Sequence, residues 1–488
     1  QQRLELQLYM GENNTERYIV AFEIGSSKIR GAIGSVDNSG VVDVIAVEEE
    51  KLTDKVRYGC IQNVDVSIAL GHIAERLQSY PRIEPRKITG VYVALGGRTL
   101  TSRTVDVNLS LPAETEITTP IINDLSQQAK AAIGGERDVV DVVPVRFTVD
   151  NKTQATPIGS YGQTVGARMT VLSCAPQMKR MLRRVIYERL GLTINGYIPR
   201  VIAEASMTLT DDERRLGCMF ADFGAETTSV AIYKNGAPLY VATLPMGSRN
   251  ITLDLTALNY IEERAEEIKK VSGNAMHQET MRRKGPGESI DYSEINNYVH
   301  ARADEIIANI MAQMEYAGVR DTDLPGGIII VGGGARLRGF NELLAQQSKM
   351  KVRQGAPTAS VRITDGSIDR TEIVDVISIL VAAAGMPPAE CLTPMPERPA
   401  KTDDAEGNSY ESLYGKGDLN KGKSRIGRMD DDRDDEDDDY NDDEEEERAK
   451  KKKHKSQHDG QRGGFSHVLS GLKDRIARII DDNSDFQD

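Results

Sequence analysis

The stretch that decides the fold is Tyr18-Ile-Val-Ala-Phe-Glu-Ile-Gly-Ser-Ser-Lys-Ile-Arg-Gly-Ala-Ile-Gly34, near the start of the chain. Apolar and β-branched residues flank a short polar run at 25–28, which predicts a β-hairpin with a tight turn. The pattern returns at Cys218-Met-Phe-Ala-Asp-Phe-Gly-Ala-Glu-Thr-Thr-Ser-Val-Ala-Ile-Tyr233. A third strand, Gly327-Ile-Ile-Ile-Val-Gly-Gly-Gly-Ala-Arg-Leu337, carries a glycine triplet and leads into a predicted helix at 339–347.

Helical patterns lie between these strands. Apolar residues at near-helical spacing, or runs rich in Glu and Lys, predict helices at 177–191, 255–271 and 298–317. Strands that alternate with helices are typical of α/β proteins. The three related strand-and-glycine patterns therefore predict an α/β fold with two related halves.

An extra segment separates the first two hairpins, at about 91–176. It contains strand-like runs at 105–111, 139–149 and 166–174, and a polar helical stretch at 119–132. We therefore expect a small inserted α+β unit.

Charge is distributed very unevenly along the 488 residues, whose formal net charge is -14. The segment from Asp430 to Glu447 contains 15 acidic residues and one basic residue, so it carries the entire excess. The rest of the chain is balanced and shows no basic excess of the kind that indicates a nucleic-acid partner. The N-terminal residues do not resemble a signal peptide, and no apolar run is long enough to span a membrane, so we expect a cytoplasmic protein.

The two hairpin turns are the best candidates for chemistry. Gly25-Ser26-Ser27-Lys28 and Gly224-Ala225-Glu226-Thr227 both offer backbone N–H groups on a sharp turn beside small side chains. Two such turns that face each other can hold a phosphate chain from both sides. Each turn alone is more typical of an ordinary hairpin, but the order of the two turns across both halves, with a glycine triplet last, is much more specific.

Acidic residues and glycines complete this candidate nucleotide site. Glu23 and Asp222 each stand two residues before a turn, and such carboxylates can hold Mg²⁺ through its water ligands. Gly332, Gly333 and Gly334 follow a buried strand, where the absence of side chains lets a flat adenosine ring approach the backbone.

These motifs together resemble the actin-like ATPase superfamily, and within it the FtsA family of bacterial cell-division proteins. The first turn has Glu23 where most of the superfamily has Asp and this family has Glu. Val91-Tyr-Val-Ala-Leu-Gly-Gly97 resembles the entry to the family's inserted subdomain, called 1C. Leu209-Thr-Asp-Asp-Glu-Arg-Arg-Leu-Gly217 and Ala265-Glu-Glu-Ile-Lys269 resemble the segments before the second phosphate strand and on the adenosine-binding helix. The resemblance covers about 18–385 and then the extreme C-terminus.

The resemblance implies a domain plan and a set of ATP-binding residues. Subdomain 1A would comprise 18–90 and 177–215, with 1C at 91–176, 2A at 216–247 and 322–393, and 2B at 248–321. The residues that would bind ATP are Gly25, Ser26, Ser27, Lys28, Asp222, Gly224, Ala225, Glu226, Thr227, Glu266, Lys269, Gly332, Gly333 and Gly334. Of these, Glu266 and Lys269 would flank the ribose and adenine, although a solvated charge pair has the same spacing.

Two residues depart from the superfamily pattern. Glu226 replaces the second glycine of the second phosphate loop, where a carboxylate repels a phosphate unless it points away or helps to hold Mg²⁺. Arg200 falls near the position of the residue that orients the attacking water, and arginine cannot accept a proton. Because Glu204 lies close by, the alignment leaves both residues as candidates. We therefore expect ATP binding with weak or no hydrolysis.

The C-terminal region has two predicted parts. Residues 394–463 are charged and polar, which predicts a disordered linker that acts as a spacer, or whose acidic block repels anionic lipid while 450–455 attract it. Residues 464–481 predict an amphipathic helix that binds a membrane surface or, alternatively, docks on the protein's own body. Its apolar face consists of Phe465, Val468, Leu469, Leu472, Ile476, Ile479 and Ile480.

The resemblance also implies a function. Family members polymerise into filaments at the cytoplasmic face of the membrane, at the division septum, and anchor the tubulin-like protein FtsZ there. The FtsZ C-terminal tail would bind subdomain 2B, and subdomain 1C would contact filament neighbours and other division proteins. The alternatives are a PilM-like pilus-assembly protein, or an actin-fold enzyme such as a chaperone ATPase or sugar kinase.

Overall fold

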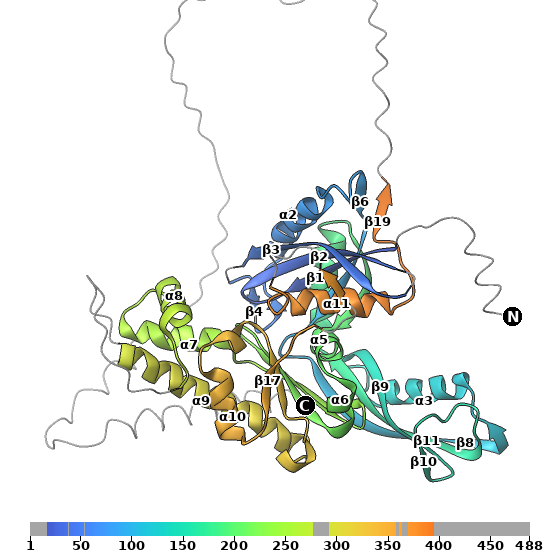
Figure 1. The fold of residues 1–488 in the computed structure, drawn as a ribbon. Coiled ribbons are helices and arrows are strands. Elements are labelled where there is room, and N and C mark those ends of the chain that lie inside the picture. The colour runs from blue at the N-terminus through green and yellow to red at the C-terminus, as the bar shows by residue number, and fades with distance from the viewer. Residues whose placement is uncertain are drawn as a thin grey trace, which may run out of the picture. The chain divides into compact units, whose positions relative to one another are not determined.

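The computed structural model describes residues 17–37, 39–52, 54–276, 292–357, 361–363 and 369–394 (Figure 1). The predicted membrane helix at 464–481 lies outside these residues, as does the predicted linker apart from Pro394.

The first half is built on a six-stranded sheet. Its strand order is β12-β7-β1-β2-β3-β18. β1 and β2 form the predicted hairpin, and β1 also pairs with β7 in parallel. The strands are β1 (Arg17–Ile24), β2 (Lys28–Val36), β3 (Val42–Lys51), β7 (Gly90–Leu95), β12 (Thr193–Pro199) and β18 (Val361–Ile363).

The second half repeats this plan in a five-stranded sheet with the order β15-β14-β13-β16-β17. β13 pairs antiparallel with β14 and parallel with β16, as β1 pairs with β2 and β7. The strands are β13 (Cys218–Phe223), β14 (Thr228–Lys234), β15 (Ala237–Leu244), β16 (Ile328–Val331) and β17 (Val352–Gln354). The prediction of an α/β fold with two related halves is confirmed.

Helices cover both faces of the first sheet, and Figure 1 shows α2 (Val66–Gln78) and α11 (Val374–Ala384) on opposite sides of it. A Cβ atom on Gly31 of β2 would lie 2.3 Å from Ile73 of α2. One on Gly34 would lie 3.5 Å from Leu380 of α11. Glycine at 31 therefore lets α2 pack closely on the sheet, whereas at Gly34 the closest atom is the carbonyl oxygen of Asp43, on the neighbouring strand, at 2.9 Å.

Short helices connect the strands of the two sheets. Helix α5 (Arg200–Thr208) begins directly after β12, and α6 (Asp211–Leu216) leads into β13. Helix α4 (Pro176–Arg183) continues as a π-helix, Arg184–Glu188, through most of the predicted helix at 177–191. The remaining short elements are β4 (Val56–Arg57), β5 (Cys60–Ile61), β6 (Arg86–Ile88), β19 (Leu392–Pro394) and the 3₁₀ turns Asp321–Asp323 and Gly333–Arg336.

The helices of the second half differ in part from the predicted ones. The single helix predicted at 255–271 is wrong, because α7 (Ser248–Leu255) ends there, a 3₁₀ turn Thr256–Leu258 follows, and α8 (Glu262–Ser272) begins later. Asn259 adopts a left-handed conformation, with φ of 65°, which stops a right-handed helix. Helix α9 (Tyr292–Tyr316) begins before the predicted 298, and α10 (Phe340–Ser348) matches the predicted helix closely.

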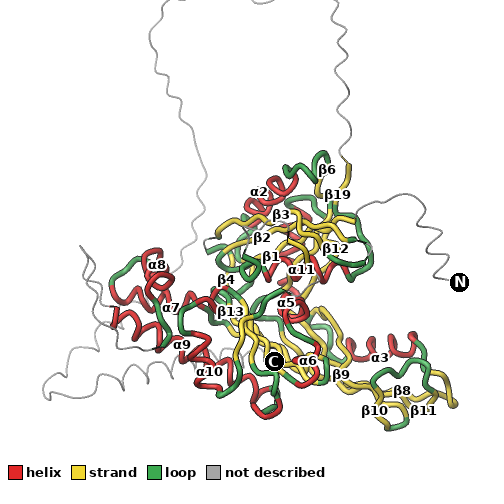
Figure 2. The backbone as a smooth tube through the Cα atoms, viewed as in Figure 1, coloured by secondary structure: helices red, strands yellow, loops and turns green. Residues whose placement is uncertain are grey.

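The insertion forms an α+β unit with a sheet of its own, ordered β10-β9-β11-β8, and Figure 2 shows its strands beside helix α3. Its buried residues, among them Ile117, Leu125 and Met169, form a separate hydrophobic cluster. The elements are β8 (Thr101–Glu116), α3 (Thr119–Ala131), β9 (Asp138–Val149), β10 (Lys152–Gln154) and β11 (Tyr161–Cys174). Two of the strands are longer than the predicted runs, but the predicted α+β insertion is confirmed.

Candidate functional site

The two predicted phosphate loops adopt the same turn. The N–H of Gly25 donates to the carbonyl of Lys28 at 3.0 Å, and the N–H of Gly224 donates to the carbonyl of Thr227 at 2.9 Å. A Cβ atom on either glycine would lie within 3.0 Å of that same carbonyl oxygen. Glycine is therefore required at both positions, because the chain closes on itself there.

Two side chains of the first turn, Ser26 and Lys28, are bonded to other parts of the protein. The Ser26 hydroxyl accepts a hydrogen bond from the N–H of Gly59 at 3.1 Å. The Lys28 ammonium pairs with Glu49 of β3 at 2.9 Å, while Ser27 is exposed. The turn therefore offers backbone groups and the Ser27 hydroxyl rather than an unpaired lysine.

A single guanidinium connects the acids that precede the two turns. Glu23 lies near the end of β1 and Asp222 near the end of β13, and both are buried. Arg200, the first residue of α5, donates from Nη1 to Glu23 Oε1 at 2.5 Å and from Nη2 to Asp222 Oδ2 at 2.7 Å. The ends of the two related strands are thus joined by an ion-pair bridge.

Burial shapes the protonation of this cluster. Burial raises the pKa of Glu23 to about 7, although the charge of Arg200 acts in the opposite direction. Burial and the nearby Asp222 raise the pKa of Glu204 well above its usual value. The Glu204 Oε2 atom has no hydrogen-bond partner among the described residues. Burial alone would lower the pKa of Arg200, but Asp222 and Glu23 raise it well above its usual value.

The predicted Mg²⁺ ligands do not suit a metal ion in this arrangement. A Mg²⁺ ion takes oxygen ligands with free lone pairs, directly or through water. Here Glu23 and Asp222 each direct an oxygen at the Arg200 guanidinium. Within the described part of the chain, no group of three or more His, Cys, Asp or Glu residues is arranged to hold a metal ion.

Glu226 makes a second bridge between the halves. Its carboxylate accepts hydrogen bonds from Arg249 Nη1 at 2.7 Å, from the N–H of Tyr58 at 2.8 Å and from Arg57 Nη1 at 3.2 Å. The cations of Arg57 and Arg249 balance its charge. The Glu226 carboxylate, which would repel a phosphate if it were unpaired, is therefore hydrogen-bonded and paired within the protein.

The other residues of the second turn are fixed by α7. The carbonyl of Gly224 accepts from the N–H of Ser248 at 2.9 Å, and the carbonyl of Ala225 accepts from the N–H of Arg249 at 2.7 Å. Thr227 is buried. The start of α7 thus holds the turn in place.

Glu266 and Lys269 form a pair, with Oε2 and Nζ 2.6 Å apart, in which Lys269 is buried while the Glu266 side chain is 34% exposed. Lys269 is only 5% exposed, and its ammonium also donates to the carbonyl of Ser248 and to the hydroxyl of Thr252. Burial raises the pKa of Glu266, but the charge and hydrogen bond of Lys269 outweigh burial and leave it below its usual value. The pair therefore holds α8 against α7, whatever further contact it makes with a ligand.

The three glycines of the predicted adenosine motif differ in their surroundings. Gly332 has a φ of 91°, and a Cβ there would lie 2.4 Å from the carbonyl of Phe223. A Cβ on Gly334 would lie 2.6 Å from the Phe223 ring. A Cβ on Gly333 would meet nothing within 4 Å. Two glycines thus allow close packing on β13, and Gly333 alone has open space beside it.

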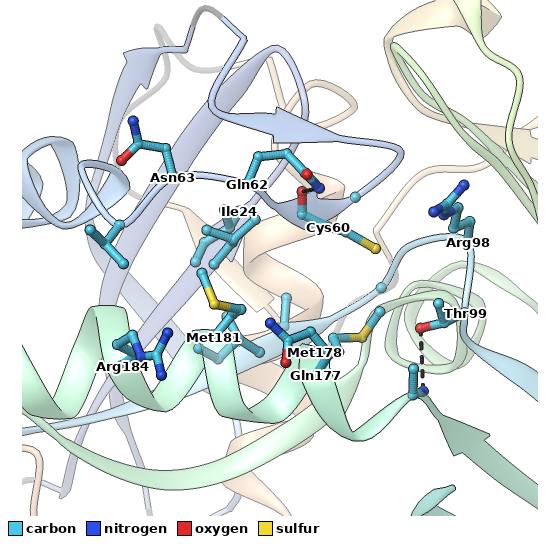
Figure 3. A pocket seen from close by; sticks show the side chains of 17 residues that line it. Ile24, Cys60, Gln62, Asn63, Arg98, Thr99, Gln177, Met178, Met181 and Arg184 are labelled. Carbon is cyan, nitrogen blue, oxygen red and sulfur yellow. Dashed lines mark hydrogen bonds between the residues drawn. The ribbon is translucent and has the colours of Figure 1, made fainter. Parts of the chain in front are cut away.

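A cavity of about 640 Å³ lies in the first half of the structure (Figure 3). Figure 3 shows Cys60, Gln62 and Asn63 on one side of it and Met178 and Met181 of α4 on the other. None of the predicted ATP-binding residues lines it. The cavity nevertheless borders the first turn, because Ile24 precedes Gly25 and the N–H of Gly59 donates to Ser26.

Comparison with known proteins identifies the family. A family model described as "Cell division protein FtsA" matches residues 219–378, and a model of the "SHS2 domain inserted in FTSA" matches 97–173. The Cell division protein FtsA of Porphyromonas gingivalis is 32% identical over 349 residues, which cover 68% of this chain and 72% of that protein. The chain belongs to the FtsA family.

Other relatives agree with this assignment. The FtsA of Pseudomonas aeruginosa is 25% identical over 372 residues, which cover 73% of this chain and 87% of that protein. A solved PilM-PilN type IV pilus biogenesis complex has a TM-score of 0.55 at 16% identity, and covers 76% of this chain and 99% of that one. At that identity the pilus protein shows the fold alone, which is the actin-like fold. The predicted PilM-like alternative thus shares the fold, whereas the sequence matches are to FtsA.

The two family models cover part of the predicted nucleotide site and the predicted insertion. The FtsA model spans the second turn, the Glu266–Lys269 pair and the three glycines. The SHS2 model falls within the predicted insertion. Sequence reasoning missed three partners of the second turn in this FtsA-family chain, namely Arg57, Tyr58 and Arg249. Nothing in their local sequence marks them, because they reach Glu226 only through the tertiary structure.

Replacing Glu226 tests the second bridge. In Glu226→Ala the N–H of Tyr58 loses its acceptor and Arg249 loses one carboxylate, so the free energy of unfolding should fall by about 1–3 kcal/mol. Hydrogen exchange at the Tyr58 amide, followed by mass spectrometry, should become faster. The exposed Glu263 of α8 supplies the control, since Glu263→Ala should change neither quantity. Unchanged exchange at Tyr58 in Glu226→Ala would show that the bridge does not hold the two halves together.

Proposed function

We propose that this chain is an ATP-binding division protein that polymerises at the cytoplasmic face of the membrane and anchors FtsZ at the septum. The observation that carries the proposal is the pair of matching glycine turns, one from each related sheet, in a chain of the FtsA family. Their acids meet at one residue, Arg200, so the ends of both strands lie at a common site.

The nucleotide would lie with its phosphates between the two turns. The turn around Ser26 and Ser27 and the turn at 224–227 supply backbone groups and hydroxyls from the two halves. The adenosine would lie near Gly333, which has open space beside it. Glu266 and Lys269 would reach it from α8. Mg²⁺ has no part in the proposal, because Arg200 already holds Glu23 and Asp222.

Hydrolysis should be weak or absent. Arg200 is a permanent cation and cannot accept a proton from the attacking water, and burial and the nearby Asp222 raise the pKa of Glu204, which favours its proton-bound form. Steady-state release of phosphate from ATP measures this directly. A turnover as fast as that of an Hsp70 chaperone would contradict the expectation and would favour the enzyme alternative.

Substitution at Gly333 tests ATP binding without disturbing the core. A Cβ at Gly333 meets nothing within 4 Å, so Gly333→Val should fold normally yet obstruct the adenosine. We expect its affinity for a fluorescent ATP analogue to fall by at least about tenfold, or about 1.4 kcal/mol. Gly135→Val is the matched control, because Gly135 also has open space around it but lies in the insertion. If both variants bind the ATP analogue with the same affinity as the unaltered chain, Gly333 does not contact the nucleotide.

The FtsZ tail is proposed to bind subdomain 2B, residues 248–321. Two exposed apolar side chains support this choice, Ile261 before α8 and Val271 within it, which are 71% and 72% exposed. Self-association into filaments and contacts of the insertion with other division proteins belong to the same proposal.

Binding of a fluorescent FtsZ C-terminal peptide, followed by anisotropy, tests the anchor function. Val271→Asp should weaken binding by about tenfold, because a charge replaces an exposed apolar contact. The matched control is Ile158→Asp, at a 51% exposed residue of the insertion. If the folded chain does not bind the peptide at all, the pilus-assembly and enzyme alternatives gain support.

Membrane binding is proposed to depend on the apolar face of 464–481. Among the described residues no helix is long and apolar enough to cross a membrane. The double substitution Leu472→Asp and Ile476→Asp should abolish co-sedimentation with anionic vesicles, since it places two charges on the apolar face. His467→Asp with Ser470→Asp adds the same charge off that face and should retain more binding. Equal sedimentation of the two double variants would contradict a membrane-binding helix.

A further inference from the structure

The position of Arg200 is set by elements of both halves. Strand β12 ends at Pro199 beside β7, and β7 lies beside β1, so the start of α5 lies near the end of β1 where Glu23 is found. From there the guanidinium also reaches Asp222 of the second sheet. The two carboxylates lie in related places on different sheets, and Arg200 is the charged group that joins them.

The surroundings of Arg200 are those of a built binding site for a cation. Its side chain is 14% exposed, and those of Glu23 and Asp222 are 3% and 6% exposed. Two buried carboxylates in one site repel each other unless a cation lies between them. A third acid, Glu204, lies 3.7 Å from Arg200 Nε. Arg200 therefore supplies the positive charge that this acidic cluster requires.

A second buried guanidinium, that of Arg30, lies nearby but does not bridge Glu23 and Asp222. Arg30 donates to Asp375 at 2.5 Å and to Glu49 at 3.2 Å, so it is held on the side of α11 and β3. No hydrogen bond of Arg30 to Glu23 or Asp222 is found among the described residues. The cation that faces both of those acids is thus Arg200.

We propose that Arg200 is a built-in cation that takes the place of a divalent metal ion between Glu23 and Asp222, so that nucleotide binds without Mg²⁺. The proposal rests on the proposed ATP-binding function for its nucleotide part only. A metal ion at this position would have to displace a guanidinium that keeps its charge at every accessible pH. Removing that guanidinium should expose two acids with the ligand chemistry that Mg²⁺ and Mn²⁺ prefer.

Titration with Mn²⁺ alone, followed by electron paramagnetic resonance, tests the cation role without nucleotide. Arg200→Gln should gain a Mn²⁺ site at least about tenfold tighter than any in the unaltered chain, and Asp222→Asn in that background should remove it. Arg200→Lys keeps the charge and should gain no site. Arg137→Gln is the matched control and should gain no site, because the partly buried Arg137 donates to the carbonyl of Thr99 and to the hydroxyls of Thr101 and Ser173, so that its removal exposes no bridged pair of acids.

The nucleotide arm compares affinity for a fluorescent ATP analogue in Mg²⁺ and in EDTA. For the unaltered chain and for Arg137→Gln, the affinities in Mg²⁺ and in EDTA should differ by less than about threefold, whereas Arg200→Gln should bind at least about tenfold more tightly with Mg²⁺. A tenfold requirement for Mg²⁺ in the unaltered chain overturns the proposal. So does a Mn²⁺ site in the unaltered chain that Asp222→Asn removes.

The two arms separate the inference from the proposed function. If no variant binds the nucleotide but Arg200→Gln gains the Mn²⁺ site, ATP binding is wrong and the cation role of Arg200 stands. If nucleotide binds and Arg200→Gln gains no Mn²⁺ site, the cation role is wrong. If Arg200→Gln does not fold, the Mn²⁺ titrations of the unaltered chain and of Arg200→Lys still test the proposal. A Mn²⁺ site in either of them that Asp222→Asn removes would overturn it.

Discussion

Two buried carboxylates that face one guanidinium are the constraint around which the two halves are arranged. Glu23 and Asp222 occupy matching places near the ends of β1 and β13, so the repeated architecture brings two negative charges together. Like charges in a buried site are unfavourable unless a cation compensates them. Arg200 supplies that cation from the helix that follows β12, on the path of the chain from the first half to the second.

A second bridge of opposite polarity lies at the second turn. There an anion, Glu226, is held by two cations, Arg57 and Arg249, and by a backbone N–H. Both bridges join the halves at the turns that the proposal assigns to phosphate. If nucleotide binds as proposed, its binding would be coupled to the contact between the halves, because the groups that join the halves lie at the two turns.

Sequence patterns predicted the strands better than the helices. The hairpins at 18–34 and 218–233 are confirmed, because runs of apolar and β-branched residues on either side of a glycine turn are local signals. The prediction of one helix at 255–271 failed over its first part, because the Glu- and Lys-rich sequence begins only at Glu262 and the left-handed Asn259 breaks the helix before it. For Glu266 and Lys269 the spacing on one helical face was correct, but spacing alone did not reveal that Lys269 is buried against α7.

The sequence by itself determined the two related halves, the insertion, the glycine turns and the family, because each depends on patterns within a few neighbouring residues or on direct sequence similarity. Only the tertiary structure decided which charges meet. Arg200 and Glu23 are 177 positions apart, and Arg57 and Glu226 are 169 apart. No local pattern encodes such a pairing, since it arises when two separately formed sheets place the ends of their strands at one site.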